Sequence, residues 1–282
     1  MPERKRILVT GGTGFVGGYF LRAALSQGHH VSSLCRPGST SKVPIGEGVN
    51  WIPVDMNSVP DEALLDHDVL VHLLAAGVTP QHVTWETAFE VNVHSSLRLW
   101  KRVGDLGVPR IVIGGSALEY GISCRRYDPI PPDAPLEPVG AYAVSKATSS
   151  LCARELAIQQ NIEVVYLRMF NLYGDGQHGE NFYPALKRAA VSGEDFEMTS
   201  GRQIRDFDRV ENAATRLLHF AVDADVQKGA PVFTNHGSGN PKTLLEYAQQ
   251  WWAEMGATGV LLPGAKPDRP GEVPSLRPML SD

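Results

Sequence analysis

The sequence predicts an α/β fold, in which helices cover both faces of a doubly wound parallel sheet and a smaller C-terminal α/β lobe follows. Apolar strand-like runs alternate with amphipathic helical stripes between residues 6 and 168, which is the pattern of such a sheet. Beyond residue 169 the alternation changes to loops, short strands and helices. We therefore expect a sheet domain over 1–169 and a smaller lobe over 170–282, with room for the chain to cross back to the sheet.

The first apolar run, at residues 7–9, leads directly into three glycines that open an amphipathic helix. In a Rossmann-type cradle, the first glycine allows a tight turn, the second lets the backbone approach a pyrophosphate, and the third lets the helix pack closely on the strand. The free N–H groups of the first helical turn then face the anion. The sequence therefore predicts a dinucleotide site formed by Gly11, Thr13, Gly14, Phe15, Val16 and Gly17.

Five more strands are expected before residue 169, because short runs rich in Val, Ile and Leu are bounded by turn residues. They lie at 29–35, 49–54, 68–76, 110–115 and 162–168. Helices are expected where apolar residues recur at a helical period. They lie at 85–103, 141–160, 209–222 and 243–255.

The residues that follow the second and third strands bear on the choice of dinucleotide. In such folds an acid after the second strand binds the ribose 2′-hydroxyl of NAD, whereas an arginine accommodates the 2′-phosphate of NADP. Here Arg36 stands at that point, with Ser39 and Thr40 nearby and no acid. NADPH is therefore the predicted cofactor, with NAD as the alternative. Asp55 and Met56 follow the third strand, at a position suited to the adenine edge.

Three residues suggest carbonyl chemistry. Tyr142 and Lys146 are four apart on a predicted helix, so the ammonium can approach the phenol and lower its pKa toward a useful range. Ser116 ends a strand and could donate a hydrogen bond to the same substrate oxygen. Together they would hold a carbonyl while a hydride arrives from a nicotinamide. Without the dinucleotide site and Ser116, a tyrosine and a lysine at this spacing would be interpreted as part of an ordinary exposed helical face.

Eight short segments, spread over nearly the whole chain, resemble the motifs of a known family. They lie at 10–17, 71–76, 92–93, 115–121, 142–146, 167–174, 205–207 and 269–272. With these segments the sequence resembles the extended short-chain dehydrogenase/reductase family, the NAD(P)-dependent sugar-nucleotide epimerases, dehydratases and reductases. The resemblance implies that Ser116, Tyr142 and Lys146 are catalytic and that Lys146 bonds the nicotinamide ribose.

The same resemblance implies further contacts. Additional cofactor contacts would come from Leu74, Ala75, Ala76, Asn92, Tyr142 and Phe170. A nucleotide-diphosphate sugar would be the substrate, with the two arginines of its site matching the phosphates, since arginine bonds phosphate in a fork. The implied substrate contacts are Ser116, Ala117, Tyr142, Asn171, Arg205 and Arg269. No metal site is expected.

The positions after Ser116 bear on the reaction class. Dehydratases of this kind carry acids there, but this chain has Ala117 and Leu118; Glu119 comes one place late, and on an extended segment it would point to the opposite face. Leu118 also replaces the cysteine of the GDP-fucose synthase type. The NADPH-dependent reduction of the C4 ketone of a nucleotide-linked 4-keto-6-deoxyhexose is therefore favoured by Arg36. The alternatives are an NAD-retaining sugar-nucleotide 4-epimerase and a catalytically silent NADP-binding regulator, which the retained catalytic residues disfavour.

Composition argues against other partners. The net charge is −5 without a clustered Lys/Arg run, which disfavours a nucleic acid or an anionic membrane surface. No apolar stretch approaches the roughly eighteen residues of a membrane span, and the basic start lacks a signal-peptide core. The three cysteines are widely spaced, which suits a reducing cytosol, and we expect a cytoplasmic protein.

The resemblance also implies an assembly. In that family the helices expected here at 85–103 and 141–160 pair across a two-fold axis, so we expect a homodimer. Trp100, Leu151 and Leu156 are apolar residues beyond what one sheet face needs. Family members usually continue past the segment at 269–272 into a further helix, whereas this sequence stops at Asp282, so the edge of the small lobe is expected to be less covered.

Overall fold

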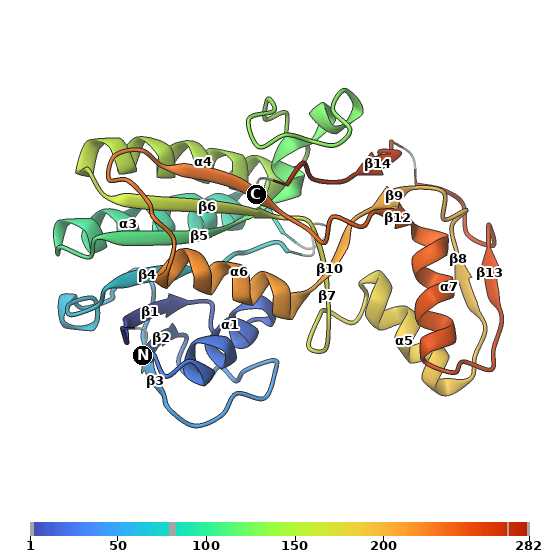
Figure 1. Cartoon of the computed structure of the whole chain (residues 1–282), viewed down its shortest axis with the longest axis horizontal. Coiled ribbons are helices and arrows are strands. Elements are labelled where there is room, and N and C mark those ends of the chain that lie inside the picture. The colour runs from blue at the N-terminus through green and yellow to red at the C-terminus, as the bar shows by residue number, and fades with distance from the viewer. Residues whose placement is uncertain (1–2, 79–82, 270, 281–282) are drawn as a thin grey trace.

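The computed structural model describes residues 3–78, 83–269 and 271–280. Its centre is a seven-stranded sheet in which every pair of neighbouring strands is parallel (Figure 1). In spatial order the strands are β11 (Val232–His236), β6 (Glu163–Met169), β5 (Arg110–Ser116), β4 (Val69–His72), β1 (Arg6–Thr10), β2 (His30–Cys35) and β3 (Val49–Pro53). The predicted doubly wound fold is confirmed.

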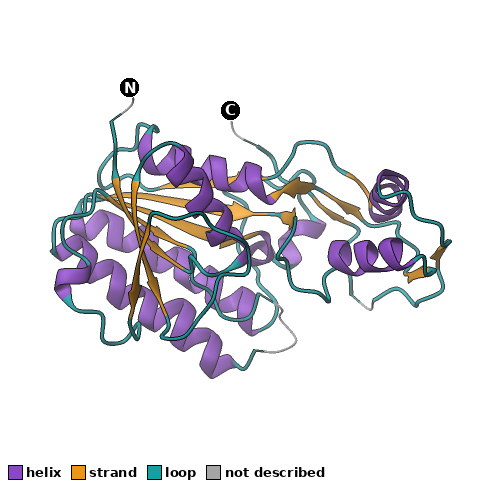
Figure 2. Ribbon diagram, turned by 90° about the horizontal axis from the view of Figure 1, so that it is seen from below, coloured by secondary structure: helices purple, strands orange, loops and turns teal. Residues whose placement is uncertain are grey.

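Helices cover both faces of this sheet (Figure 2). One face is packed by α1 (Phe15–Ser26) and α6 (Val210–Val222). The other is packed by α3 (Ser96–Asp105) and α4 (Ala141–Gln160). Because all the strands run in one direction, their carboxyl ends meet at one edge of the sheet, where ligands bind in folds of this kind.

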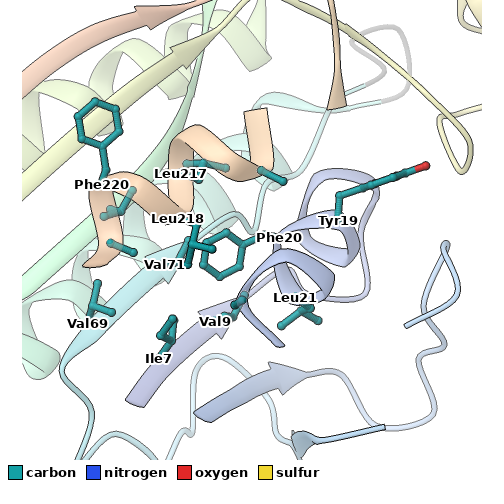
Figure 3. Close-up of a cluster of buried hydrophobic side chains, with 14 of the residues drawn as sticks. Ile7, Val9, Tyr19, Phe20, Leu21, Val69, Val71, Leu217, Leu218 and Phe220 are labelled. Carbon is teal, nitrogen blue, oxygen red and sulfur yellow. The ribbon is translucent and has the colours of Figure 1, made fainter. Parts of the chain in front are cut away.

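Alternation along the buried strands divides the core into two layers. Ile7 and Val9 of β1 pack with Phe20 and Leu217 under α1 and α6, as the close-up shows (Figure 3). Leu8, between them, packs in the opposite layer under α3 and α4. All five side chains are fully buried. Each such side chain contributes about 1.5–3 kcal/mol by leaving water, so the two layers hold the strand ends, and the residues on them, in place.

Two elements differ from expectation. The strand β11 was not predicted, and with α6 it returns the chain from the second half of the sequence to the main sheet. The helix expected over 85–103 is divided into α2 (Trp85–Phe89), a π-helical turn η3 (Glu90–Ser95) and α3. Single π turns inside helices are frequent at functional sites, and this one carries Asn92.

The smaller lobe extends to one side of the sheet (Figure 1). Its two helices, α5 (Phe182–Ser192) and α7 (Leu244–Glu254), enclose an aromatic core in which Trp251 contacts the rings of Tyr173, Tyr183 and Phe207. Its short strands are β7 (Asn171–Tyr173), β8 (Phe196–Met198), β9 (Ile204–Arg205), β10 (Phe207–Arg209), β12 (Lys242–Thr243), β13 (Leu261–Pro263) and β14 (Ser275–Leu276).

The surface of the helices named for assembly differs in part from expectation. Trp100 and Leu156 are 1% and 7% exposed and belong to the core under α3 and α4, so their expected place at a dimer surface is wrong. Leu151 is 61% exposed and Ile158 is 51% exposed on α4. Within the described residues, no helix is long and apolar enough to cross a membrane.

Candidate active site

The turn between β1 and α1 is closed by glycines. Gly11 has a φ of +75°, which favours glycine, and its carbonyl accepts the Gly14 N–H at 2.9 Å. A Cβ on Gly17 would lie 2.1 Å from the Gly11 oxygen, so only glycine allows this approach of helix to strand. Among the described residues, a Cβ on Gly14 would meet only that same oxygen within 4 Å, at 3.1 Å. The described part of the chain therefore leaves the outer side of Gly14 uncovered.

This turn fits a dinucleotide pyrophosphate. Gly14 is the N-cap of α1 and has no side chain with which to satisfy the N–H groups of the first helical turn. Those groups and the positive end of the helix favour an anion at this place. Thr13, Phe15 and Val16 are half-buried around the turn. The Thr13 carbonyl accepts the Lys42 N–H at 3.0 Å, which draws the loop after β2 against the cradle.

The loop after β2 presents a cation. Arg36 is exposed, and within the described chain no carboxylate forms an ion pair with it. Ser39 folds back on Arg36: its N–H and its hydroxyl both donate to the Arg36 carbonyl, at 3.0 and 2.8 Å. Ser39 thus shapes the loop that presents the arginine. After β3, the exposed Asp55 carboxylate accepts the Asn57 N–H at 2.8 Å, and Met56 is half-buried.

Asn92 joins the loop after β4 to the helix that carries Tyr142. The side chain is 2% exposed; its oxygen accepts the Ala76 N–H at 2.8 Å, and its amide nitrogen donates to the Ala76 carbonyl at 2.9 Å. The same nitrogen donates to Ser145 Oγ of α4 at 2.9 Å. The expected cofactor residues Leu74, Ala75 and Ala76 are half-buried in this loop. In this structure Asn92 therefore positions that loop.

Ser116, Tyr142 and Lys146 converge at the carboxyl end of β5. Ser116 is the last residue of β5, Tyr142 lies in the first turn of α4, and Lys146 follows one turn later. Tyr142 and Lys146 are 8% and 2% exposed. The Tyr142 phenol is hydrogen-bonded to Ser116, and Lys146 Nζ donates to the Gly114 carbonyl at 2.7 Å. The structure thus brings together the three residues predicted to be catalytic.

The electrostatics of the tyrosine differ from expectation. Burial raises the pKa of Tyr142 to about 12, and the hydrogen bond with Ser116 opposes this rise. Lys146 was expected to lower that pKa, but its ammonium is bonded to the Gly114 carbonyl, and burial lowers its own pKa. Tyr142 is therefore a neutral phenol at neutral pH and can donate its proton.

The segment after Ser116 is a 3₁₀ turn, η4 (Ala117–Tyr120), and not the extended chain that was expected. Ser116 caps it: its Oγ accepts the Leu118 N–H at 3.2 Å, and its own N–H donates to Glu119 Oε1 at 2.8 Å. Glu119 is fully buried in an ion pair with Arg168. The carboxylate is thus directed away from solvent by the turn and the ion pair, and not by strand alternation.

Two expected contacts fall in a hydrophobic cluster. The side chains of Ala117 and Phe170 are 4% and 7% exposed and pack around Tyr120. Both side chains thus belong to the core cluster beside Ser116, and the contacts expected of Ala117 with substrate and of Phe170 with the cofactor stay predictions. Leu118 is 41% exposed on the same turn.

The residues expected to hold the diphosphate lie in the smaller lobe. Arg205, on β9, is 9% exposed and pairs with Glu272 at 2.9 Å, because β14 lies beside β9 and brings Glu272 close. Arg269, three positions before Glu272 in the sequence, is exposed. Asn171, on β7, donates to the Asp206 carbonyl at 3.5 Å. A diphosphate bound by Arg205 would therefore share this guanidinium with Glu272.

The chain is similar over most of its length to known proteins. Residues 7–233 match the NAD dependent epimerase/dehydratase family. UDP-glucose 4-epimerase of Azospirillum brasilense is 26% identical over 96% of this chain and 83% of its own length. The dTDP-6-deoxy-L-talose 4-dehydrogenase (NAD(P)(+)) of Kitasatospora kifunensis is 27% identical over 94% of this chain and 84% of its own. The structure of MoeE5 in complex with UDP-glucuronic acid and NAD is 26% identical, with a TM-score of 0.82 over 98% of this chain and 90% of that chain.

Proposed function

The chain belongs to the NAD dependent epimerase/dehydratase family, and we propose that within this family it reduces the C4 ketone of a nucleotide-linked 4-keto-6-deoxyhexose with NADPH. The observation that carries the proposal is Arg36, an exposed cation at the end of β2 where NAD would favour an acid. A second support is the protonated Tyr142 phenol, since reduction of a ketone requires a proton at the oxygen.

Each catalytic residue has a distinct part in this reaction. Bound NADPH supplies a hydride to the ketone carbon. The Ser116 oxygen accepts the Leu118 N–H, and its hydroxyl, which is hydrogen-bonded to the Tyr142 phenol in this structure, would donate to the substrate oxygen in place of that bond. Tyr142 gives its proton to the same oxygen as negative charge develops there. Lys146, buried one helical turn away, would bond the nicotinamide ribose.

The proposal gives substrate binding to the smaller lobe. We propose that Arg205 and Arg269 hold the diphosphate and that Asn171 contacts the sugar nucleotide, because these residues lie on β9, on the neighbouring segment and on β7. The ligands named with MoeE5, UDP-glucuronic acid and UDP-glucose, are of this chemical class. The Kitasatospora relative is named for a reaction at C4 with either dinucleotide.

A sugar-nucleotide 4-epimerase that retains NAD is the second candidate, favoured by relatives named UDP-glucose 4-epimerase. Two assays separate the candidates. Purified protein is mixed with NADPH and a panel of UDP-, dTDP-, GDP- and CDP-linked 4-keto-6-deoxyhexoses, and loss of the reduced nicotinamide absorbance is followed. We expect turnover of at least one panel member. Interconversion of UDP-glucose and UDP-galactose without added reductant, and no use of NADPH, would establish the epimerase instead.

We further propose that the protein is a homodimer formed through the helices between residues 85 and 105 and through α4. Leu151 and Ile158 lie seven residues apart (158 − 151) on α4, and because two helical turns are about seven residues, they share one face. Both are more than half exposed, as is Trp85 of α2. Sedimentation at micromolar concentration should give the mass of two chains, and Leu151→Glu should give the mass of one. A wild-type monomer would reject the proposal.

A further inference from the structure

A buried polar cluster lies behind Ser116 and away from solvent. It consists of Glu119, Tyr166 and Arg168, which we call the Glu119 cluster. Glu119 and Tyr166 are fully buried, and Arg168 is 4% exposed. None of these residues takes part in the chemistry described above. The cluster is built by packing: a Cβ on Gly115 would lie 2.2 Å from the Tyr166 ring and 3.0 Å from Glu119 Oε1.

Both carboxylate oxygens of Glu119 have partners. Oε2 accepts Arg168 Nε at 2.8 Å. Oε1 accepts the backbone N–H of Ser116 at 2.8 Å and lies 3.0 Å from the Tyr166 hydroxyl. The Ser116 N–H is the last donor of β5, and Glu119 closes the capping box in which the Ser116 side chain also takes part. The carboxylate therefore fixes the backbone that orients the catalytic hydroxyl.

The cluster also contacts α4, the helix that carries Tyr142 and Lys146. The Tyr166 hydroxyl lies 3.0 Å from the Lys146 carbonyl oxygen, and Lys146 Nζ lies 5.8 Å from the Tyr166 ring. The guanidinium of Arg168 is held between the rings of Tyr120, Tyr166 and Phe233, and it donates to the Pro132 carbonyl at 3.0 Å. The Glu119 cluster thus links β5, which carries Ser116, to α4, which carries Tyr142 and Lys146.

Stability alone does not account for this arrangement. A buried ion pair often stabilises a protein no better than an apolar pair of similar volume, because both charges must be desolvated. An apolar residue at position 119 would, however, leave the Ser116 N–H without its acceptor. The carboxylate therefore has a specific geometric use at this place.

We propose that Glu119, held by Arg168 and Tyr166, is a positioning residue that fixes Ser116 beside Tyr142 for the transfer of hydride to the sugar ketone. This inference rests on the proposed function, since it assigns the Ser116 hydroxyl a substrate oxygen to bind. Glu119 itself does not touch the substrate; it acts through the Ser116 backbone.

Two double variants test the proposal, because removing Glu119 alone would leave the Arg168 charge buried and unpaired. Glu119→Gln with Arg168→Met removes both charges but keeps an oxygen that can accept the Ser116 N–H. Glu119→Leu with Arg168→Met removes the charges and that acceptor. The two proteins share the loss of the ion pair and differ only at the acceptor. For both, kcat, KM and the melting temperature are measured with the panel substrate, and hydrogen exchange is measured at the Ser116 amide.

We expect the Gln variant to keep kcat within about threefold of wild type and the Leu variant to lose up to about 100-fold in kcat at similar KM, as for a misplaced catalytic group. The Ser116 amide should exchange roughly ten- to a hundredfold faster in the Leu variant, because it has lost a hydrogen bond. Equal kcat in two folded double variants would overturn the proposal, and so would equal exchange.

Failure of the proposed function is detected separately. If wild-type protein reduces no panel member but interconverts UDP-glucose and UDP-galactose, the reductase assignment is rejected, and the two variants are compared in that interconversion. The hydride transfer in either reaction needs a held oxygen at C4, so a kcat difference between the variants supports positioning and equal kcat overturns it. The exchange measurement requires no turnover.

Discussion

The carboxyl ends of β5 and β2 lie at the same edge of one parallel sheet but are built in opposite ways. At the end of β5, Ser116 is fixed by the Leu118 and Glu119 groups of its own capping box, and the neighbouring Lys146 ammonium is buried and bonded to a carbonyl. At the end of β2, Arg36 is exposed and forms no ion pair within the described chain. Under the proposed function, the chemistry would belong to the end whose polar groups are already paired, and recognition of the 2′-phosphate to the exposed end.

The difference has a physical reason. A catalytic group must be held in a productive geometry before the substrate arrives, because misplacement by about 1 Å can cost a factor of about 100 in rate. A phosphate-binding arginine needs only a free guanidinium, since the charge and the fork geometry supply the interaction when the anion binds. Substitutions at the two ends should therefore affect different quantities.

Tyr142→Phe is expected to have the largest effect. It removes the proton donor while keeping the ring that fills the buried space, so kcat should fall by roughly 10²–10⁴-fold, the usual contribution of a positioned general acid. NADPH affinity should change little, because the cradle is untouched. Steady-state reduction of the panel substrate and fluorescence titration with NADPH measure the two quantities.

A matched control is Tyr247→Phe. This tyrosine is also buried, and its hydroxyl donates to the Asn240 carbonyl at 2.9 Å in the smaller lobe. Its loss should cost about 1 kcal/mol of stability and leave kcat near wild type. A similar fall in kcat for both variants would show that the effect is one of folding and would contradict the role of Tyr142.

Arg36→Asp should give the next largest effect, and on binding instead of rate. It replaces a phosphate partner by a repelling charge, so NADPH affinity should weaken by roughly 10–100-fold more than NADH affinity. The dissociation constants of both cofactors are measured for wild type and variant. Lys228→Asp, at an exposed position on another loop, makes the same change in net charge and should not discriminate between the cofactors. Equal losses for NADPH and NADH in Arg36→Asp would remove the basis of the NADPH assignment.

The sequence was sufficient to predict the candidate residues at both strand ends, but not the buried side chains that support Ser116. The place of Arg36 at the end of β2 was predicted from the local pattern, because recognising a strand and the residue that follows it requires no knowledge of tertiary contacts. Ser116, Tyr142 and Lys146 were also predicted together. The support of Ser116 was not, since Arg168 lies on β6 and meets Glu119 only when β6 pairs with β5. A buried acid is visible in a sequence only as a polar residue in an apolar setting, which does not name its partner.

Other errors have related causes. A helical stripe shows which residues are apolar but not which neighbour covers them, so the core residues Trp100 and Leu156 were assigned to a dimer surface. The π turn of η3 needs one additional residue in a turn that an averaged period does not reveal. The strand β11 follows α6 and a loop, and its place beside β6 is a long-range pairing that the local pattern does not reveal.

The smallest effect is expected at a third region. Its buried polar groups contact one another, as at the end of β5, but they have no assigned part in the reaction. Asp208 and His236 are 5% and 7% exposed, and their carboxylate and imidazole lie 3.0 Å apart where β10 and β11 meet the start of α6. Burial raises the pKa of Asp208, but the adjacent His236 imidazole and the hydrogen bonds from the Asn212 amide and the Arg209 N–H outweigh it, so the pKa is lowered. Its ionised form is therefore favoured by folding, and this stabilisation is present above the pKa of the unfolded carboxyl and lost as the pH falls through the lower, folded value.

Asp208→Asn should cost about 1 kcal/mol of stability at about pH 7, with kcat unchanged, and the difference in stability from wild type should shrink below about pH 4. Urea unfolding at about pH 7 and below about pH 4 measures this difference in stability. The control is Asp225→Asn, at an exposed position. A difference that grows toward acid would mean that the charged carboxylate destabilises the fold, and a loss of kcat in the folded variant would show that this region, like the end of β5, serves the reaction.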